Sequence, residues 1–256
     1  DPSRTGQLVH GTTLWTNYIG LNCQMPPLDD RRVRQALNYA VNKQDVIALL
    51  NGRGIVAQGI VPPGMPGYTS DVVGYPYDPE RARTLLREAG LSAGFTAELW
   101  TQGSDLDLKV GQKIQHDLSQ IGVTMEIKPV AWSSFLEAIR QPRAVALFDL
   151  GWSADFPDPS NFLDVLFHSS RWDANNHTFY ANPEFDHLLE HARTLRDPVA
   201  RNREYLAAEH VLVDDAPVIL LYHPISYVML QPRVHGYTIH PLVPARFTNL
   251  WLDPEP

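Results

Sequence analysis

Three apolar segments alternate with two amphipathic segments between residues 95 and 150, and this alternation constrains the fold more than any other feature of the chain. An apolar residue at every second position predicts a strand, whereas an apolar stripe with a period of 3.6 predicts a helix. The predicted elements are strand 95–100, helix 110–121, strand 123–127, helix 133–140 and strand 144–150. A β-α-β-α-β order implies parallel strands with helices on both faces. The sequence therefore predicts an α/β fold in which ligands bind beyond the carboxyl ends of the strands.

Four of the predicted helices begin in the same way, with a capping side chain followed by proline. The side-chain oxygen can accept a hydrogen bond from the first helical turn, and proline suits the first helical position because the N–H that it lacks has no partner there. The four pairs are Asp78-Pro79, Asp158-Pro159, Asn182-Pro183 and Asp197-Pro198. Further predictions are helices at 33–41 and 46–50, strands at 218–222 and 226–230, and a Pro- and Gly-rich surface loop at 52–79.

The composition argues against several classes of protein. The 256 residues carry a net charge of −8 and contain no cluster of lysine and arginine, so neither nucleic acid nor an anionic membrane is expected as a partner. No apolar run approaches the ~18 residues of a membrane span. The single cysteine, Cys23, makes an internal disulfide impossible. No cofactor is predicted, because the sequence contains no P-loop, nucleophile elbow or Cys-x-x-Cys motif.

The segment GWSADFPDPSNFL, residues 151–163, follows the last of the predicted parallel strands and carries the candidate binding residues. Asp158 is explained by the helix that it caps. Asp155 lies too early to be a cap and is flanked by the aromatic residues Trp152 and Phe156. A carboxylate among aromatic rings is costly unless it is paired, and the cation of a ligand can form the pair. Contact with a ligand and an Asx interaction that stabilises the turn are both compatible with the sequence.

The segment HLLEH, residues 187–191, matches the inverted motif of zinc proteases, which makes a zinc-dependent hydrolase the alternative function. Helical spacing places the apolar residues around it on one face and His187, Glu190 and His191 on the opposite face. A catalytic zinc site needs a cleft and supporting hydrogen bonds. The pattern therefore indicates a solvated polar face, and we expect no metal there.

Three motifs together resemble the peptide/nickel class, family 5, of extracytoplasmic solute-binding proteins, the receptors of ABC importers. The motifs are DDRRVRQALNYAVNKQDVI at 29–47, GYPYDPERARTLLREAG at 74–90 and GWSADFPDPSNFLDVLF at 151–167. The resemblance implies a non-enzymatic receptor with two lobes, of which this chain is the C-terminal, periplasmic-binding-protein-like lobe, a mixed or parallel sheet flanked by helices, without the N-terminal lobe. Residues 1–20 would be a crossing or hinge segment, 21–217 the ligand-binding lobe and 218–256 a return segment that packs on the N-terminal lobe.

The resemblance also implies roles for individual residues. Asp155 would bind the α-amino group of a peptide, Trp152 and Trp132 would line the cleft, Ser153 would present its backbone there, and Phe156 would lie beside it. Some members carry an arginine where this chain has Asp149, and dipeptide-type members carry a basic residue in the loop that reads WTQGSDLD here, at 100–107. The chain thus offers acids where relatives offer bases.

The expected function is the capture of a peptide-like ligand with a free amine, at the periplasmic or outer face of the cell membrane, for delivery to ABC permease subunits. A signal peptide and a lipid anchor would lie in the part that precedes this sequence. Binders of nickel, haem or sugars share the scaffold and remain alternatives, as does a structural module without a ligand.

Overall fold

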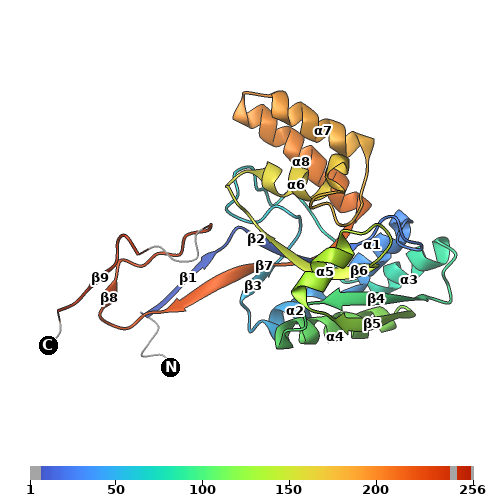
Figure 1. Ribbon diagram of the computed structural model, residues 1–256, viewed down its shortest axis with the longest axis horizontal. Helices are drawn as coiled ribbons and strands as arrows, with labels where there is room; N and C mark the ends of the chain where they lie inside the picture. The colour runs from blue at the N-terminus through green and yellow to red at the C-terminus, as the bar shows by residue number, and fades with distance from the viewer. Residues whose placement is uncertain (1–6, 243–246, 255–256) are drawn as a thin grey trace.

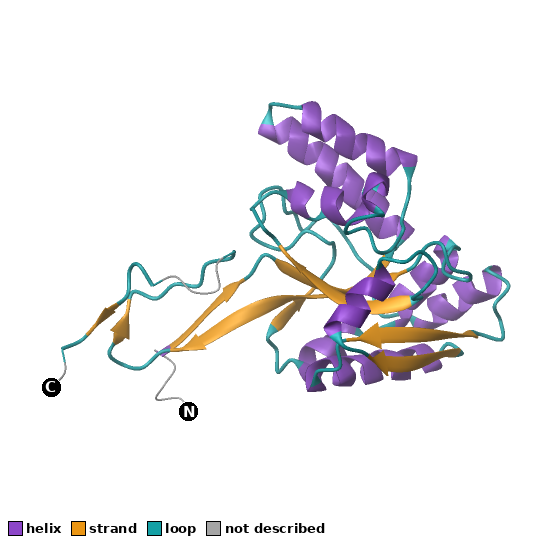
Figure 2. Cartoon of the chain, in the orientation of Figure 1, coloured by secondary structure: helices purple, strands orange, loops and turns teal. Residues whose placement is uncertain are grey.

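A computed structural model of the chain describes residues 7–242 and 247–254 and contains a mixed sheet flanked by helices (Figures 1 and 2). The sheet has seven strands in the order β1-β7-β2-β6-β4-β5, with β3 also paired to β7. The strands are β1 Leu8–Thr12, β2 Trp15–Leu21, β3 Gly54–Val56, β4 Phe95–Thr101, β5 Val123–Pro129, β6 Leu147–Ser153 and β7 Val218–Met229. A separate two-stranded sheet joins β8 Val234–His235 to β9 Trp251–Leu252.

The helices lie where the sequence predicts them. They are α1 Arg31–Ala40, α2 Lys43–Leu49, α3 Pro79–Glu88, α4 Asp105–Ser119, α5 Trp132–Ile139, α6 Leu163–Phe167, α7 Pro183–Thr194 and α8 Pro198–Asp215. However, α4 begins at Asp105, five residues before the predicted start at 110, and α1 and α2 also begin two and three residues earlier than predicted. All four predicted caps accept a hydrogen bond from the first turn that follows them. One of the four differs in detail, because Asp158 caps a 3-10 turn, Pro159–Asn161, and α6 begins only after it. Within the described residues, none of the helices is apolar over a length sufficient to span a membrane.

The predicted β-α-β-α-β unit is confirmed, since β4 runs parallel to both β5 and β6. A hydrophobic core lies on each face of the sheet. The face that we call the α1/α4 face buries residues of α1, α3 and α4 against Ile19, Leu99, Leu147 and Ile219. The opposite face, the α5/α8 face, buries residues of α5 to α8 against Tyr18, Phe148 and Leu220. Successive residues of a strand alternate between these two cores, which fixes the side to which each site residue points.

Three further details, in the strands and loops, differ from the sequence predictions. Strand β6 begins at Leu147 rather than at 144 and continues through the Gly-Trp-Ser segment, because residues 147–153 pair with β2. The two strands predicted in the tail are one continuous strand, β7, in which Pro224 pairs with β3. The predicted surface loop 52–79 contains β3 and also contributes buried side chains, among them Ile60, to the core.

Strand β7 changes surroundings along its length. Its first part lies inside the lobe and pairs with β2, whereas residues 225–229 pair with β1 in a two-stranded ribbon that leaves the lobe (Figure 1). The expected boundary at 20/21 lies inside β2, and the one at 217/218 lies where β7 begins, so the buried first part of β7 falls in the predicted return segment. The ribbon is therefore shorter than the predicted crossing segments. Their role between two lobes stays a prediction. Residues 1–6, 243–246 and 255–256 of these segments lie outside the described residues.

Candidate functional site

The end of β6 forms the centre of the candidate site. Trp152 and Ser153 are the last two residues of the strand, and Asp155 and Phe156 lie in the bend that follows. The backbone N–H of Ala154 donates to the Leu14 carbonyl at 2.8 Å, which fixes the point where the chain leaves the sheet. Beyond this point the chain turns outward: Asp155 is exposed and the Phe156 side chain is 47% exposed.

Asn161, which the sequence interpretation did not single out, holds this bend in place. Its Oδ1 accepts hydrogen bonds from Trp152 Nε1 and from the backbone N–H of Asp155, both at 3.0 Å. Its side chain is almost completely buried, and a buried amide needs such partners because an unpaired one is costly. Asn161 therefore connects the indole of Trp152 to the backbone that carries Asp155. The sequence signal that could have indicated this role is the position of Asn161, three residues after the capping Asp158.

The carboxylate of Asp155 makes few contacts with the described residues. Its only hydrogen bond with a described residue is a long one, 3.5 Å from Asn161 Nδ2, and no described lysine, arginine or histidine forms an ion pair with it. The sequence also allowed an Asx interaction in which the Asp155 side chain stabilises its own turn. In the structure the shorter hydrogen bonds of this turn come from Asn161. The expected cleft around Asp155 stays a prediction.

A second anchor holds the same bend against α8. The Asp158 carboxylate receives two hydrogen bonds from the Arg201 guanidinium, at 2.7 and 2.8 Å, and one from the backbone N–H of Ser160 at 3.0 Å. A bidentate pair of this kind fixes orientation as well as distance. Asp158 is therefore structural, as the sequence predicts.

Three tryptophans occur at the carboxyl ends of the parallel strands. Trp132 opens α5 directly after β5, is 47% exposed and stacks on Phe135 with ring centroids 5.5 Å apart. Trp152 from β6 and Trp100 from β4 both pack against the core of the α5/α8 face, to which Phe135 belongs. Trp100 also donates from Nε1 to Glu98 at 3.2 Å. The predicted wall residues Trp132 and Trp152 thus lie on one face, and Trp100 joins them.

Asp149 is separated from the other predicted site residues. Leu147 belongs to the core of the α1/α4 face and Phe148 to that of the opposite face, so alternation directs Asp149 to the α1/α4 face, away from Trp152. Burial, together with the nearby carboxylate of Asp107, raises the pKa of Asp149 to about 7. The same alternation turns the Ser153 side chain away from Trp152, so Ser153 joins the candidate site of Trp132, Trp152, Asp155 and Phe156 through its backbone alone. The predicted ligand role of Asp149 stays a prediction.

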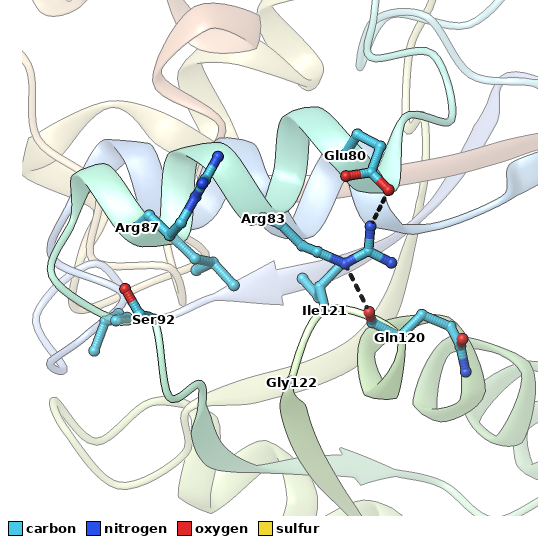
Figure 3. Close-up of a pocket in the computed structure, with 9 residues that line it drawn as sticks. Glu80, Arg83, Arg87, Ser92, Gln120, Ile121 and Gly122 are labelled. Carbon is cyan, nitrogen blue, oxygen red and sulfur yellow. Dashed lines mark hydrogen bonds and ion pairs between the residues drawn. The ribbon is translucent and has the colours of Figure 1, made fainter.

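A hollow of about 400 Å³ lies at the other edge of the sheet (Figure 3). It is bounded by α3 and by the turn that leads into β5, where Gly122 directly precedes the strand. Arg83, which points across it, pairs with Glu80 and donates to the Gln120 carbonyl at 3.1 Å. This hollow is remote from the carboxyl ends of the strands, and we do not include it in the site.

The HLLEH segment lies on α7, with His187, Glu190 and His191 all exposed, as helical spacing predicts. Two of the three contact other side chains: Glu190 lies 3.5 Å from His168 Nε2, and His191 Nδ1 lies 3.4 Å from Glu204. Across residues 7–242 and 247–254, no three histidine, cysteine or acidic side chains are arranged to hold a metal ion. The zinc-hydrolase alternative thus finds no support in this geometry.

Comparisons with known proteins agree on one protein family. The sequence pattern described as "Bacterial extracellular solute-binding proteins, family 5 Middle" matches residues 3–174. The dipeptide-binding protein of Escherichia coli K12 is 34% identical over 243 residues, which are 92% of this chain and 45% of that protein. The heme-binding protein A of Haemophilus influenzae is 35% identical over 253 residues, 96% of this chain and 46% of that protein.

A solved structure agrees with these matches. The ABC transporter-associated periplasmic binding protein DppA of Helicobacter pylori, in complex with the peptide STSA, superposes with a TM-score of 0.87 and 29% identity. The superposition covers 98% of this chain and 50% of that one. The chain therefore spans about half the length of the relatives that it matches.

Proposed function

Because this chain belongs to family 5 of the bacterial extracellular solute-binding proteins, we propose that it contributes to a receptor that binds a peptide-like solute by its free amino group. The observation that carries this proposal is the exposed Asp155 carboxylate, which forms no ion pair with a described cation and whose backbone N–H is held by Asn161. A relative named for dipeptides and a solved relative in complex with a peptide support the ligand class.

In this proposal each residue of the site has one task. Asp155 forms an ion pair with the ammonium group of the ligand, and the backbone of Ser153 hydrogen-bonds to the peptide. Trp132, Trp152 and Phe156 supply apolar surface for the side chains and exclude water, which strengthens the ion pair because the local dielectric constant falls. No part of this requires a catalytic group, and we propose a binding protein rather than an enzyme.

Haem is the competing ligand, because one relative is named for it. Protein ligands to haem iron are histidine, cysteine, methionine or tyrosine side chains. The candidate site, consisting of Trp132, Trp152, Ser153, Asp155 and Phe156, contains none of these. The free carboxylate therefore favours an amine over haem. Nickel chelates and sugars share the scaffold but gain no specific support from the site.

We further propose that the lobe supplies one wall of a two-lobed receptor. The chain spans about half the length of its relatives, and the β1–β7 ribbon extends away from the lobe, as a connection to a second lobe would. Such a receptor would work outside the cytoplasm and deliver its ligand to the permease of an ABC importer. Binding by one wall is expected to be weak, because enclosure between two lobes supplies most of the buried area.

The test measures the binding of a short peptide to the 256-residue chain by following NMR chemical shifts at millimolar peptide concentrations. Replacing Asp155 by asparagine should weaken binding about two- to fivefold, because an ion pair on an exposed wall contributes up to about 1 kcal/mol. Acetylation of the peptide's amino group should cause a similar loss in the unmodified protein and no further loss in Asp155→Asn.

Glu184→Gln is the matched control. Glu184 is exposed in the first turn of α7, whose cap Asn182 bonds to Asp215 just before β7, at the end of the strands opposite to Asp155, so the variant removes the same charge away from the site. Equal affinity of Asp155→Asn and the unmodified chain for the free-amine peptide would refute the amine site.

A further inference from the structure

A second hollow of about 400 Å³ lies at the end of the strands opposite to Asp155, and we call it the Arg34 hollow. Cys23 on its wall follows the end of β2, which pairs with the first residue of β6, whereas Asp155 follows the last residue of β6. We propose that the Arg34 hollow binds a free α-amino acid, a ligand that carries a carboxylate and an ammonium group on one carbon atom. Its polar wall includes Cys23, Asp29, Arg34, Tyr180, Asn182 and Asp215.

The position of the Arg34 hollow makes it independent of the site at Asp155. Asp215 on its wall directly precedes β7, whereas the ribbon leaves the lobe at residues 225–229, the other end of the same strand. A second lobe joined through the ribbon would therefore leave this hollow open to solvent. An amino acid bound there would not compete with a ligand at Asp155, so the inference does not depend on the proposed function.

The Arg34 guanidinium is the group that would hold the carboxylate of the ligand. Arg34 is only 6% exposed; its Nε donates to the Asp215 carbonyl at 2.9 Å, and its Nη1 donates to the Leu28 and Asp29 carbonyls at 2.9 and 3.2 Å. Among the residues that the structure describes, none accepts a hydrogen bond from Nη2, although Arg34 lines the hollow. A guanidinium always carries its charge and suits carboxylates, and here its other two nitrogens already fix its orientation.

Two carboxylates on the same wall would hold the ammonium group. Asp29 is exposed, and its carboxylate forms no hydrogen bond or ion pair with any residue in the described ranges. Oδ2 of Asp215 accepts from Tyr180 Oη at 2.6 Å and from Asn182 Nδ2 at 2.7 Å, whereas Oδ1 lies 3.6 Å from Arg31 Nη1, beyond hydrogen-bond distance. These carboxylates would repel a simple anion, and the buried guanidinium would repel a simple cation. A ligand with both charges fits this wall best.

The size of the hollow and the thiol on its wall agree with a small ligand. Sites for small molecules typically have volumes of about 300–1,000 Å³, a range that includes this hollow. Burial raises the pKa of Cys23 to about 11, and the charges of Arg34 and Asp215 act on it in opposite directions, so the thiol is close to both groups and protonated at neutral pH. An amino acid held by Arg34 should therefore cover the thiol.

The test uses Cys23 as a reporter, because it is the only cysteine of the chain. The 256-residue chain is alkylated with iodoacetamide at mildly alkaline pH, where part of the thiol is ionised, and modification of Cys23 is followed by mass spectrometry. At ~10 mM L-alanine the alkylation should slow at least about threefold, as expected for a millimolar affinity. N-acetyl-L-alanine lacks the ammonium group and L-alaninamide lacks the carboxylate, so each should slow the alkylation much less.

Three variants locate the protection. Asp29→Asn should reduce the protection by L-alanine, and the fold should be unaffected because this side chain has no hydrogen bond or ion pair with the described residues. Arg34→Lys keeps a positive charge but removes Nη2 and should abolish the protection. Glu126→Gln is the matched control: Glu126 is exposed on the edge strand β5, outside the hollow, and the variant should retain full protection. A far-ultraviolet circular dichroism spectrum shows whether each variant is folded.

Every outcome decides between the Arg34 hollow and its alternatives. Protection by L-alanine that is reduced in Asp29→Asn and unchanged in Glu126→Gln and Asp155→Asn supports the hollow, whatever the fate of the amine site. Absence of protection by L-alanine would overturn the inference, as would equal protection by all three compounds. Protection that is lost in Asp155→Asn would assign the effect to the amine site and also overturn it. If Arg34→Lys does not fold, the comparison of the three compounds on the unmodified chain still decides the question.

Discussion

The two parts of β7 show how differently one strand can be stabilised along its length. Residues 218–221 are buried on both sides of the sheet, whereas Tyr227 and Met229 are 39% and 57% exposed. The first part is held by two hydrophobic cores and by β2, while the second is held mainly by its ladder with β1. Two-stranded ribbons are marginally stable alone, so we expect the lobe to determine the stability of the chain and the ribbon to add little.

The largest effect is expected from Ile219→Ala. Ile219 is completely buried and pairs with Ile19, and truncation of a core isoleucine to alanine costs about 2–5 kcal/mol. The free energy of unfolding, measured by denaturant titration, should fall by this amount. A loss below about 1 kcal/mol would mean that the first part of β7 is no better anchored than the ribbon.

An intermediate effect is expected at the junction of the two parts, where His223 is buried. Burial lowers the pKa of His223 to about 4, and its Nδ1 lies 3.0 Å from Thr16 Oγ1. An unfolded histidine titrates near ~6.5, so between the two pKa values the unfolded chain binds more protons and stability falls as the pH falls. By pH 4 this one group should remove about 3 kcal/mol.

The measurement compares the unmodified chain with His223→Gln from pH 7 to pH 4. The difference between the two chains separates the contribution of His223 from that of Glu209. Burial raises the pKa of Glu209 to about 7, so the effect of Glu209 on stability has the opposite sign: it destabilises the fold as the pH rises. The stability advantage of histidine over glutamine should decline as the pH falls. A difference that is independent of pH would contradict a buried neutral histidine.

The smallest effect is expected from Met229→Ala, the matched truncation in the ribbon. Because this side chain is mostly exposed, the free energy of unfolding should change by less than about 0.5 kcal/mol. The same denaturant titration checks it. A loss comparable to that of Ile219→Ala would show that the ribbon is part of the folded core.

The lobe was largely predictable because its signals are local. Helix caps such as Asp78 and Asp197 depend on a hydrogen bond within one turn, and the parallel unit follows from periodicity. The start of β6 was not predictable from periodicity, because it depends on its partner strand β2, which ends at Leu21 opposite Leu147. Likewise, Pro224 suggests a break in β7, but β3 pairs alongside it.

The candidate site was predictable only in part. Asp155 and Trp152 were found from their residue types and position after a strand, but the role of Asn161 depends on how the bend folds back. The separation of Asp149 from Trp152 could not be read from the sequence, because the predicted strand ended at 150 and only the structure extends β6 through Trp152.

The two anchors of the bend after β6 affect the association rate of a ligand and the entropic cost of binding it. Asn161 ties it to the strand and Asp158 ties it to Arg201 of α8 before any ligand arrives. The conformational entropy of this segment is thus lost during folding rather than during binding, and a preorganised loop retains more of its contact energy as affinity. Encounter with a peptide should then require little rearrangement of this wall, so that association is limited by diffusion and docking rather than by ordering of the bend.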